Sequence, residues 1–426
     1  MKLKPRRVVL ALFLFCMLGL LSCRYVLSPV GDIAFVMLTW RSEDTSTTMT
    51  VLYQTEDNPG VSKIVYDTVS RKNDKQAYRQ QTLGSRIHFK QRDRFIHTVE
   101  LSGLKAATRY YFAVSDKHGT RGEEYSFRTL PDDGSPIRIV AGGDMDTTQV
   151  AAQLSRQAAR LNPDLAIIGG DIAYAEGRMK KAAKWDRWMA DWCRLMITTD
   201  GRIIPFIASI GNHEINHKKQ GKSALKRAPF FLRYLNQDSD KRSYFTRKIG
   251  GNSALIVLDT SHLRVVEGEQ TQWLSKQLLK YQNRLYRFAM YHKPMYPGGI
   301  YRDIIPGVNR DLADLWGPLF DDFKLTLALE NHYHVHKRTK PLKHNAVSAE
   351  PGATVYLGGG AWGTTPRKVK PDLWYLASAY SKNHIWVIDV SEQKIDYRAV
   401  DAEGVVFDRG ESFPSTLTSS ILRSTQ

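Results

Sequence analysis

The hydrophobic pattern of the sequence changes once, near residue 130, and this change sets the fold. Before it, short segments alternate apolar and polar residues between turn residues, which is typical of antiparallel strands. The expected strands cover residues 34–40, 49–53, 63–66, 95–101, 109–114 and 125–129. Residues 128–134 contain proline and glycine and form the expected linker. We therefore predict an all-β sandwich over residues 33–131.

Beyond residue 136, short apolar runs alternate with helical patterns. The expected strands are residues 137–141, 165–168, 205–210, 254–258, 287–291, 325–329 and 354–357, and the expected helices are 149–161, 180–196, 270–281 and 310–320. Such alternation predicts a layered α/β domain, here over residues 136–409. Residues 384–390 and 394–400 flank a turn and predict a hairpin at a sheet edge. Residues 410–426 are the expected C-terminal tail.

The first 22 residues resemble a bacterial lipoprotein signal peptide. A basic stretch precedes an apolar run, residues 8–21, that is short for a membrane span. The run ends in Leu-Leu-Ser-Cys, which is similar to a lipobox, so Cys23 is the expected lipid anchor and residues 23–32 a tether. A cleaved secretory signal and an uncleaved anchor are the alternatives. All three export the protein, either to the periplasm or outer membrane as a lipoprotein or as a secreted protein.

Charge and cysteine content restrict the partners and the stabilising bonds. The formal net charge is +18, and loss of residues 1–22 with their four basic residues leaves +14. This charge favours anionic partners without choosing among phosphate esters, nucleic acids and anionic lipids. No basic run with interleaved aromatic residues predicts a specific nucleic-acid groove, and nothing indicates the oligomeric state. Once Cys16 leaves and Cys23 carries lipid, Cys193 is expected to be a buried free thiol.

Metal-capable side chains follow five of the predicted strands. The five segments are Gly143-Asp144, Gly170 to Tyr174, Gly211 to Glu214, Tyr291-His292 and Asn331 to His334. In α/β sheets the strand ends are where ligands bind, so residues this far apart in sequence can converge there. Carboxylates, an amide, imidazoles and a phenol together suit hard or borderline metals. Each signal alone is weak, but the full set predicts a shared metal site.

In this order the segments resemble the five motif blocks of the calcineurin-like metallophosphoesterases. Tyr174, three residues after Asp171, is similar to the tyrosine of the purple acid phosphatase branch. The stretch "IHTVELSGLKAATRYYFAVSDKHG…YSFRTLP" resembles the fibronectin-III-like domain that precedes the catalytic domain in that branch. The resemblance covers nearly all of residues 33–400. It implies a four-layer α/β-β/α metallophosphoesterase domain behind the β-sandwich.

The resemblance also implies a dinuclear centre. Iron(III) would be held by Asp144, Asp171, Tyr174 and His334, with Asp171 bridging to a zinc(II), manganese(II) or iron(II) ion held by Asn212, His292 and His332. Two such ions lower the pKa of a bound water and can stabilise the attacking and leaving oxygens of a phosphoryl group. The implied reaction is hydrolysis of phosphate monoesters by a metal-activated hydroxide. The implied catalytic residues are His213, Asp171 and Asn212.

His213 follows the expected ligand Asn212 and is implied to contact the phosphoryl group or relay a proton, with a supporting structural role as the alternative. Glu214 is its expected hydrogen-bond partner, unless it is a solvated loop carboxylate. Tyr301 and Arg302 stand where the plant enzymes have two histidines, so both are expected to bind substrate, with simple loop solvation as the alternative. An acidic pH preference is therefore in doubt.

Three further positions carry expectations about local structure. Asn331 replaces the usual glycine before His332, and asparagine tolerates a positive φ, so we expect that conformation there. His336 is expected at the rim of the site. Asp146 is expected to cap the following helix rather than to tune the metal.

Two other functions remain open. A phosphodiesterase of the same fold would act on nucleotides, nucleic acid or lipid headgroups, because two metals cleave diesters equally well. A non-catalytic surface lipoprotein would use the sandwich domain to bind a partner. The substrate, small or polymeric, is expected to be phosphorylated in either enzymatic reading.

Overall fold

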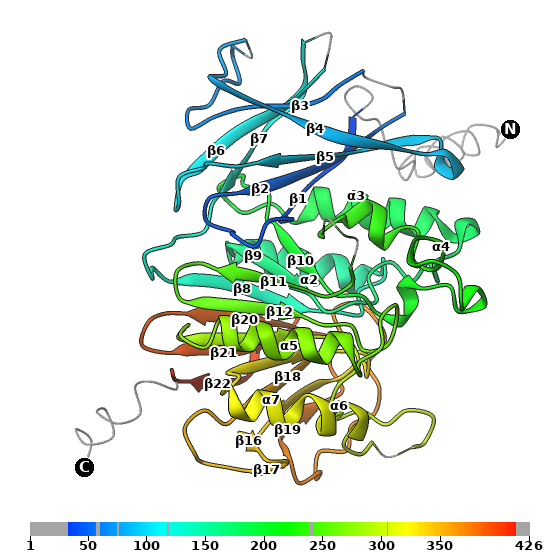
Figure 1. The fold of residues 1–426 in the computed structure, drawn as a ribbon, viewed down its shortest axis with the longest axis vertical. Helices are drawn as coiled ribbons and strands as arrows, with labels where there is room; N and C mark the ends of the chain where they lie inside the picture. Colours follow the sequence, from blue (N-terminus) through cyan, green and yellow to red (C-terminus); the bar gives the residue numbers. More distant parts are fainter. Residues whose placement is uncertain are drawn as a thin grey trace, which may run out of the picture.

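A computed structural model describes residues 33–56, 60–74, 76–116, 119–238, 240, 242–304 and 306–414. An N-terminal β domain stands on a larger domain of stacked sheets with helices outside them (Figure 1). The predicted signal peptide, tether and lipid anchor, and the last twelve residues of the predicted tail, lie outside the described residues. No helix among the described residues is long and apolar enough to span a membrane.

The first domain is one antiparallel sheet in the strand order β1-β2-β5-β4-β3-β6-β7. The strands are β1 (Ile33–Thr39), β2 (Met49–Thr55), β3 (Ser62–Asp67), β4 (Gln80–Phe89), β5 (Arg94–Leu101), β6 (Arg109–Asp116) and β7 (Gly119–Arg128). Apolar side chains from β2 and β5 share a core with those from β3, β6 and β7. The all-β character predicted for this part is confirmed.

Strand β4 joins the two halves of this sheet and was missed in the sequence. Its first half pairs with β3 and its second half with β5. Almost all of its side chains are exposed. A strand without a buried face carries no apolar alternation, so the hydrophobic pattern gave no signal for it.

The second domain contains two large sheets. The first has the order β10 (Phe206–Ala208), β9 (Leu165–Ile168), β8 (Ile137–Gly142), β20 (Ile385–Val390), β21 (Ile395–Val400) and β22 (Val406–Ser412). The second has the order β11 (Phe245–Ile249), β12 (Ser253–Val257), β13 (Tyr286–Met290), β14 (Leu327–Glu330), β18 (Val355–Gly359), β15 (His336–Thr339) and β19 (Leu376–Tyr380). A small hairpin is formed by β16 (Leu342–Lys343) and β17 (Ala346–Val347).

The α-helices are α2 (Gln149–Arg160), α3 (Ala183–Leu195), α4 (Ala224–Arg227), α5 (Glu269–Lys280), α6 (Arg310–Leu315) and α7 (Gly317–Asp322). Short 3-10 turns occur at Lys90–Arg92, Met179–Lys181, Asn212–Glu214 and His217–Lys219, and a π-helical turn at Phe231–Leu235. The single helix predicted over 310–320 is two helices, because Pro318 begins a new one at α7.

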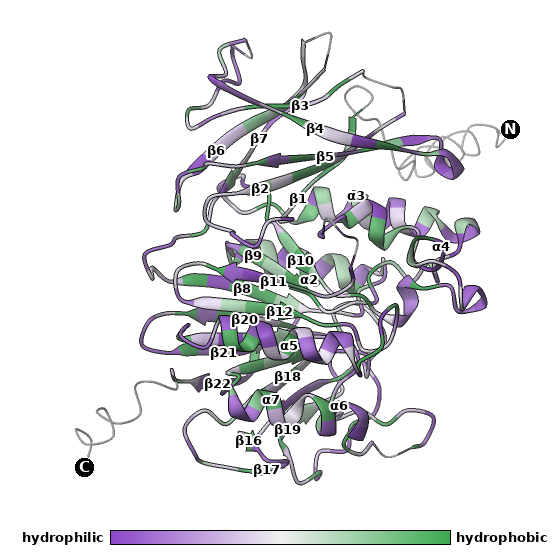
Figure 2. Cartoon of the chain, viewed as in Figure 1, coloured by the Kyte–Doolittle hydropathy of each residue, from purple (hydrophilic) through white to green (hydrophobic). Residues whose placement is uncertain are grey.

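The layers follow from the way the buried side chains divide. Ile167 of β9 and Phe288 of β13 belong to one core, so the two large sheets pack face to face. Leu154 of α2 packs with the other face of the first sheet, and Leu274 of α5 with the other face of the second. Figure 2 shows the hydrophobic colour gathered on the central strands and the hydrophilic colour on loops and outer helix faces. The predicted four-layer α/β-β/α arrangement is confirmed.

The terminal strands extend further than predicted. β20 and β21 form the expected hairpin, with Ile385 opposite Val400, and β20 also pairs with β8. The edge itself is β22, which runs through Ser412 and so passes the expected domain end at residue 409. Like β11, β15 and β19, it was missed because its polar and apolar residues do not alternate regularly.

Strand β1 fixes the two domains together. Thr39 Oγ1 donates to the Phe206 carbonyl at 2.7 Å, and the buried Arg247 guanidinium donates to the Trp40 carbonyl at 2.7 and 3.1 Å. Cys193 Sγ lies 3.4 Å from the Val36 carbonyl, and burial raises the pKa of this free thiol to about 12. Cys193 is thus an inert packing residue at the domain boundary.

Candidate metal centre

The loops that leave β8, β9, β10, β13 and β14 bring the predicted ligands together. These strands are parallel within their sheets, so their carboxyl ends lie at one edge of each sheet. Asp144 follows β8, Asp171 and Tyr174 follow β9, Asn212 and His213 follow β10, His292 follows β13, and His332 and His334 follow β14. The structure places these side chains in two adjoining groups.

The first group consists of Asp144, Tyr174 and His334. Asp144 Oδ1 lies 3.0 Å from His334 Nε2 and 3.3 Å from Tyr174 Oη. His334 Nε2 and Tyr174 Oη are 3.3 Å from each other. The other carboxylate oxygen, Asp144 Oδ2, accepts the backbone N–H of His332 at 2.8 Å. Asp144 is fully buried. A carboxylate, a phenol and an imidazole therefore converge within the reach of one cation.

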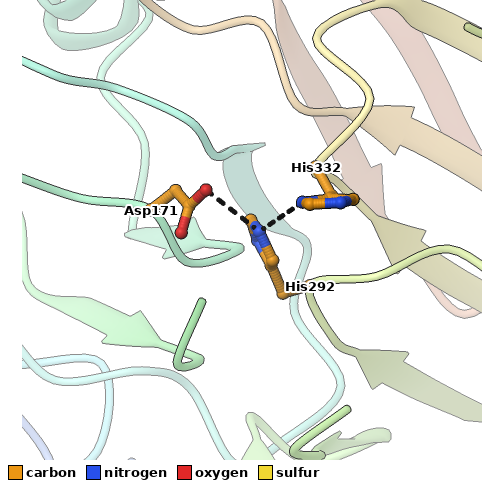
Figure 3. Close-up of side chains that lie close together, drawn as sticks. All are labelled: Asp171, His292 and His332. Atoms are coloured by element: carbon orange, nitrogen blue, oxygen red, sulfur yellow. Dashed lines mark hydrogen bonds and ion pairs between the residues drawn. The ribbon is translucent and has the colours of Figure 1, made fainter. Parts of the chain in front are cut away.

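The second group is centred on His292, which is also fully buried. Its Nε2 lies 3.1 Å from Asp171 Oδ2, from Asn212 Oδ1 and from His332 Nδ1. Figure 3 shows His292 between Asp171 and His332. Its Nδ1 donates to the Gly169 carbonyl at 2.8 Å, so in the neutral ring Nε2 presents a lone pair. The possible ligand atoms of Asp171, His292 and His332 lie within 4.8 Å of one another, close enough to hold one metal ion.

Such a group of acceptors needs a positive charge at its centre. Asp171 Oδ2 is buried and makes no hydrogen bond of regular geometry. Burial lowers the pKa of His292, but the charges of Asp171 and Asp144 outweigh it and raise that pKa to about 9. Burial and the His292 charge lower the pKa of His332 to about 2, which keeps its lone pair free. Without a metal, the positive charge at this position is a proton on His292, and a bound cation would replace that proton.

The phenol of Tyr174 points to the same conclusion. Burial and the negative charges of Asp144, Asp171 and Glu214 raise the pKa of Tyr174 well above its ordinary value. The protein alone therefore keeps this side chain neutral. A phenolate at this position requires the added charge of a bound cation.

The backbone is strained at most of the candidate ligands. Five of the seven have left-handed φ angles: Asp144 54°, Asp171 51°, Tyr174 55°, His332 72° and His334 52°. That conformation costs roughly 1 kcal/mol or more for a residue other than glycine. Left-handed residues other than glycine also occur elsewhere among the described residues, but five among seven converging polar side chains favour a functional site.

His213 lies beside both groups. Its backbone N–H donates to Asp171 Oδ1 at 2.7 Å, its ring Nδ1 is 2.7 Å from Glu176 Oε1, and its Nε2 is 3.8 Å from Asp171 Oδ2. The ring also stacks obliquely on Tyr174, with 4.2 Å between centroids. Burial opposes protonation, but the Glu176 hydrogen bond and the Asp171 charge raise the pKa of His213 above its ordinary value.

Comparison with known families identifies this arrangement. Residues 34–129 match the purple acid phosphatase N-terminal domain, and residues 112–336, more than half of the chain, match the calcineurin-like phosphoesterase family. The chain belongs to the calcineurin-like phosphoesterase family. Its N-terminal domain is of the purple acid phosphatase type, as the sequence predicted.

Relatives and solved structures agree with this assignment. Purple acid phosphatase 21 of Arabidopsis thaliana is 23% identical over 87% of this chain and 83% of its own length. A purple acid phosphatase of Glycine max is 25% identical over 74% of this chain and 69% of its own. Among solved structures, the purple acid phosphatase from yellow lupin seeds has a TM-score of 0.72, with 16% identity, over 89% of this chain and 74% of its own. PhoD has a TM-score of 0.65, with 12% identity, over 90% and 91%.

Glu214 has a role in the phosphoesterase domain that neither sequence interpretation foresaw. It is buried, and its carboxylate accepts the backbone N–H groups of Asp171, Ile172 and Gly211, each at 2.8 Å. Burial and the Asp171 charge raise the pKa of Glu214 to about 7. Glu214 therefore holds the ligand loop in shape, and Glu176 is the carboxylate bonded to His213. The signal for Glu176 was its place two residues after Tyr174.

Asn331 does not adopt the expected positive φ, which falls on His332 instead. Its side-chain amide donates to the Tyr291 carbonyl at 3.2 Å and fills the space above Gly143 and Gly169. A side chain on Gly169 would collide with that amide. Asn331 is thus a packing residue that fits two glycines of the ligand loops.

Two other expectations around the site are wrong. His336 is not at the rim, because it is fully buried in β15 with Nε2 3.0 Å from Asp408 Oδ2 of β22. Asp146 does not cap α2, because Thr148 accepts the N–H of Ala151 at 3.1 Å. The Asp146 carboxylate instead lies 3.2 Å from Lys184 Nζ.

The rim of the phosphoesterase site contains Tyr301 and Arg302, both exposed, and Arg367, which the sequence did not single out. The Arg367 backbone N–H donates to the His334 carbonyl at 2.9 Å, and its Nη1 donates to the His332 carbonyl at 3.2 Å. Its guanidinium carbon is 4.5 Å from the centroid of the Tyr301 ring. Arg367 has no motif of its own, and only its position shortly after the glycine run at 358–360 hinted at a place near the cleft.

Proposed function

We propose that this phosphoesterase hydrolyses phosphate monoesters with two bound metal ions, outside the cytoplasm. The observation that supports this most is the pair of adjoining ligand groups around Asp144 and His292. In each group, neighbouring ligand atoms lie 3.0 to 3.3 Å apart at buried or half-buried positions. In the absence of metal, the Tyr174 hydroxyl and a proton on His292 supply the donors among these acceptors, and a pair of cations would replace them.

The ligand chemistry suits the two sites differently. Asp144, Tyr174 and His334, with Asp171, would hold iron(III), since a phenolate and carboxylates favour a hard, highly charged ion. Asn212, His292 and His332, with Asp171 shared, would hold zinc(II), manganese(II) or iron(II). Two bound cations supply charge for a phosphate dianion and make water acidic enough to attack at neutral pH.

The protein's own residues supply orientation and a proton. Glu176 accepts from Nδ1 of His213 and so fixes the ring, leaving Nε2 on the side of Asp171. A protonated His213 at this place can donate to a phosphoryl oxygen or to the departing alkoxide. Glu214 holds the Asp171 loop, and Gly360 lets the backbone approach Asp144 closely, because a side chain there would lie 2.8 Å from Asp144 Oδ2.

The test is hydrolysis of p-nitrophenyl phosphate by purified protein across acid to alkaline pH. We expect activity that is lost after chelation and restored by metal addition. Bis(p-nitrophenyl) phosphate is the matched diester, and a faster rate on it than on the monoester would contradict the monoesterase proposal. A protein that binds no metal and cleaves neither substrate is not an enzyme of this kind.

We propose further that Cys23 anchors the protein to a membrane by lipid. The support is the basic and apolar leader that ends in Leu-Leu-Ser-Cys. Changing Cys23 to serine should abolish incorporation of a labelled fatty acid into the protein, without altering its specific activity. A wild-type protein that incorporates no label, or a C23S protein that still does, would refute the lipid anchor.

A further inference from the structure

We propose that the rim beside the metal centre is an anion subsite formed by Arg302 and Arg367, and that the enzyme prefers phosphate monoesters whose leaving group carries a second anionic group. That group is a carboxylate or a further phosphate. The inference rests on the proposed phosphatase activity, because it concerns the substrate class of the same site.

The two arginines lie on two short segments, residues 298–304 and 367–370, that pair through backbone hydrogen bonds. We call this pair of segments the ribbon. Ile300 N–H donates to the Lys368 carbonyl at 2.7 Å and Lys370 N–H donates to the Gly298 carbonyl at 3.1 Å, so the chain around 298–304 pairs with the chain around 367–370. A side chain on Gly299 would lie 2.8 Å from the Tyr333 carbonyl, which shows that the ribbon packs on the loop carrying His332 and His334.

The ring of Tyr301 contacts both charges. The guanidinium carbons of Arg302 and Arg367 lie 5.1 and 4.5 Å from the centroid of its ring, within the range of cation–π contacts. Two positive charges held at one ring make this part of the rim attractive to an anion. Guanidinium groups bind carboxylate and phosphate through paired hydrogen bonds, so either group suits this place.

Neither arginine is neutralised by the protein. Among the described residues, no carboxylate oxygen lies within 4.0 Å of the guanidinium nitrogens of Arg302 or Arg367. Arg367 uses one nitrogen for the His332 carbonyl, and Arg302 makes no side-chain hydrogen bond with any described residue. By contrast, Lys370 in the same ribbon bonds to Asp372 at 2.7 Å. Among the described residues of the ribbon, Arg302, Arg367 and the exposed Lys368 therefore have no carboxylate partner, whereas Lys370 is already paired.

The turn at the tip of the ribbon has a strained backbone at Arg302, whose side chain is exposed there. Tyr301 and Ile304 exchange backbone hydrogen bonds at 3.3 and 3.0 Å, and the two residues between them, Arg302 and Asp303, have φ angles of 52° and 61°. A turn of this kind favours asparagine and glycine. Arginine and aspartate in these positions cost conformational energy, which is expected at a ligand-contacting turn.

The position of Arg367 separates this subsite from the reacting phosphate. It contacts the carbonyls of His332 and His334, while the ring nitrogens of both histidines face the metal centre. An anion bound by Arg367 and Arg302 thus lies beside the cleft rather than among the metal ligands.

The experiment compares two substrates that differ by one anionic group, glycerol 3-phosphate and 3-phosphoglycerate. We expect wild-type kcat/KM to be about tenfold higher for 3-phosphoglycerate, which is the effect of one charge-assisted contact. Arg302→Gln and Arg367→Gln should each reduce that preference through KM, and any fall on p-nitrophenyl phosphate, which has no second anionic group, should be smaller than the fall on 3-phosphoglycerate. Lys370→Gln, the paired neighbour, should leave the preference intact.

Three results would overturn the subsite. One is equal kcat/KM for the two substrates in the wild type. Another is an Arg302→Gln enzyme with an unchanged preference, because Arg302 is exposed and forms half of the subsite. The third is an equal fall on all substrates in both variants, which would mean that the arginines bind the reacting phosphate. An enzyme inactive on every monoester instead refutes the proposed function itself.

Discussion

Two buried histidines, one in each domain, show how a structural polar group differs from a functional one. His97 in β5 is fully buried, with Thr55 Oγ1 2.9 Å from its Nε2 and Ser62 Oγ 2.8 Å from its Nδ1. Hydroxyls can donate or accept, so both ring nitrogens of His97 are satisfied by the protein. His292 is equally buried, but three acceptors crowd its Nε2.

The pKa values of the two rings move in opposite directions. Burial lowers the pKa of His97 to about 4, since nothing near it stabilises a positive charge. At His292 the carboxylates of Asp171 and Asp144 overcome burial and raise the pKa to about 9. Burial alone does not identify a site. An excess of uncompensated lone pairs at a buried position does, because it requires an added cation.

Removal of Asp171, the carboxylate that the two proposed metal sites would share, should have the largest effect. Asp171→Ala is expected to lower kcat on p-nitrophenyl phosphate about a thousandfold or more, because several kcal/mol of charge stabilisation go with the lost metals. Metal content per chain should fall in parallel. A matched control is Asp164→Ala, which removes a carboxylate at the opposite end of the same strand, where it accepts the Arg138 N–H. Full activity in Asp171→Ala would mean that the acceptors around His292 do not hold a catalytic metal, so His292 would be a structural residue like His97.

Removal of His213, the proposed proton donor, should give the next largest effect. His213→Gln is expected to reduce kcat about a hundredfold, the usual worth of general acid catalysis. Glu176→Gln should reduce it less, because the ring remains but its orientation and charge weaken. Since the Glu176 carboxylate raises the pKa of His213, its loss lowers that pKa and moves the alkaline limb of the pH–rate profile to lower pH. A limb that moves to higher pH would contradict this role.

The smaller effect concerns stability of the first domain. His97 has a folded pKa of about 4 against 6.5 for the free side chain, so the unfolded chain binds more protons between these values. Stability should therefore fall as pH drops from about 6.5 to 4, by about 3 kcal/mol if the shift is complete. Urea unfolding of wild type and His97→Gln at several pH values measures this. The variant should be less stable at neutral pH but should lose less stability on acidification.

The order of the ligand segments could be predicted from the sequence because each ligand follows a buried strand. Asp144 and Asp171 follow apolar runs that predict their strands. Because the ends of parallel strands lie at one edge of the sheet, these residues are expected to lie close together. Glu214 could not be placed, because its partners are backbone N–H groups of another loop. Arg367 reaches the site through bonds to the His332 and His334 carbonyls, contacts between distant segments that no local pattern encodes. β4 could not be predicted from hydrophobic alternation, because almost all of its side chains are exposed and need not be apolar.

The most direct test of the centre is metal analysis together with a visible absorption spectrum of wild type and Tyr174→Phe. If the phenol of Tyr174 binds iron(III), purified wild-type protein contains iron, and it absorbs broadly in the visible range. Tyr174→Phe should lose that band. A wild-type protein that binds no metal when supplied with iron, zinc and manganese would contradict the claim that the acceptors around Asp144 and His292 enclose cations.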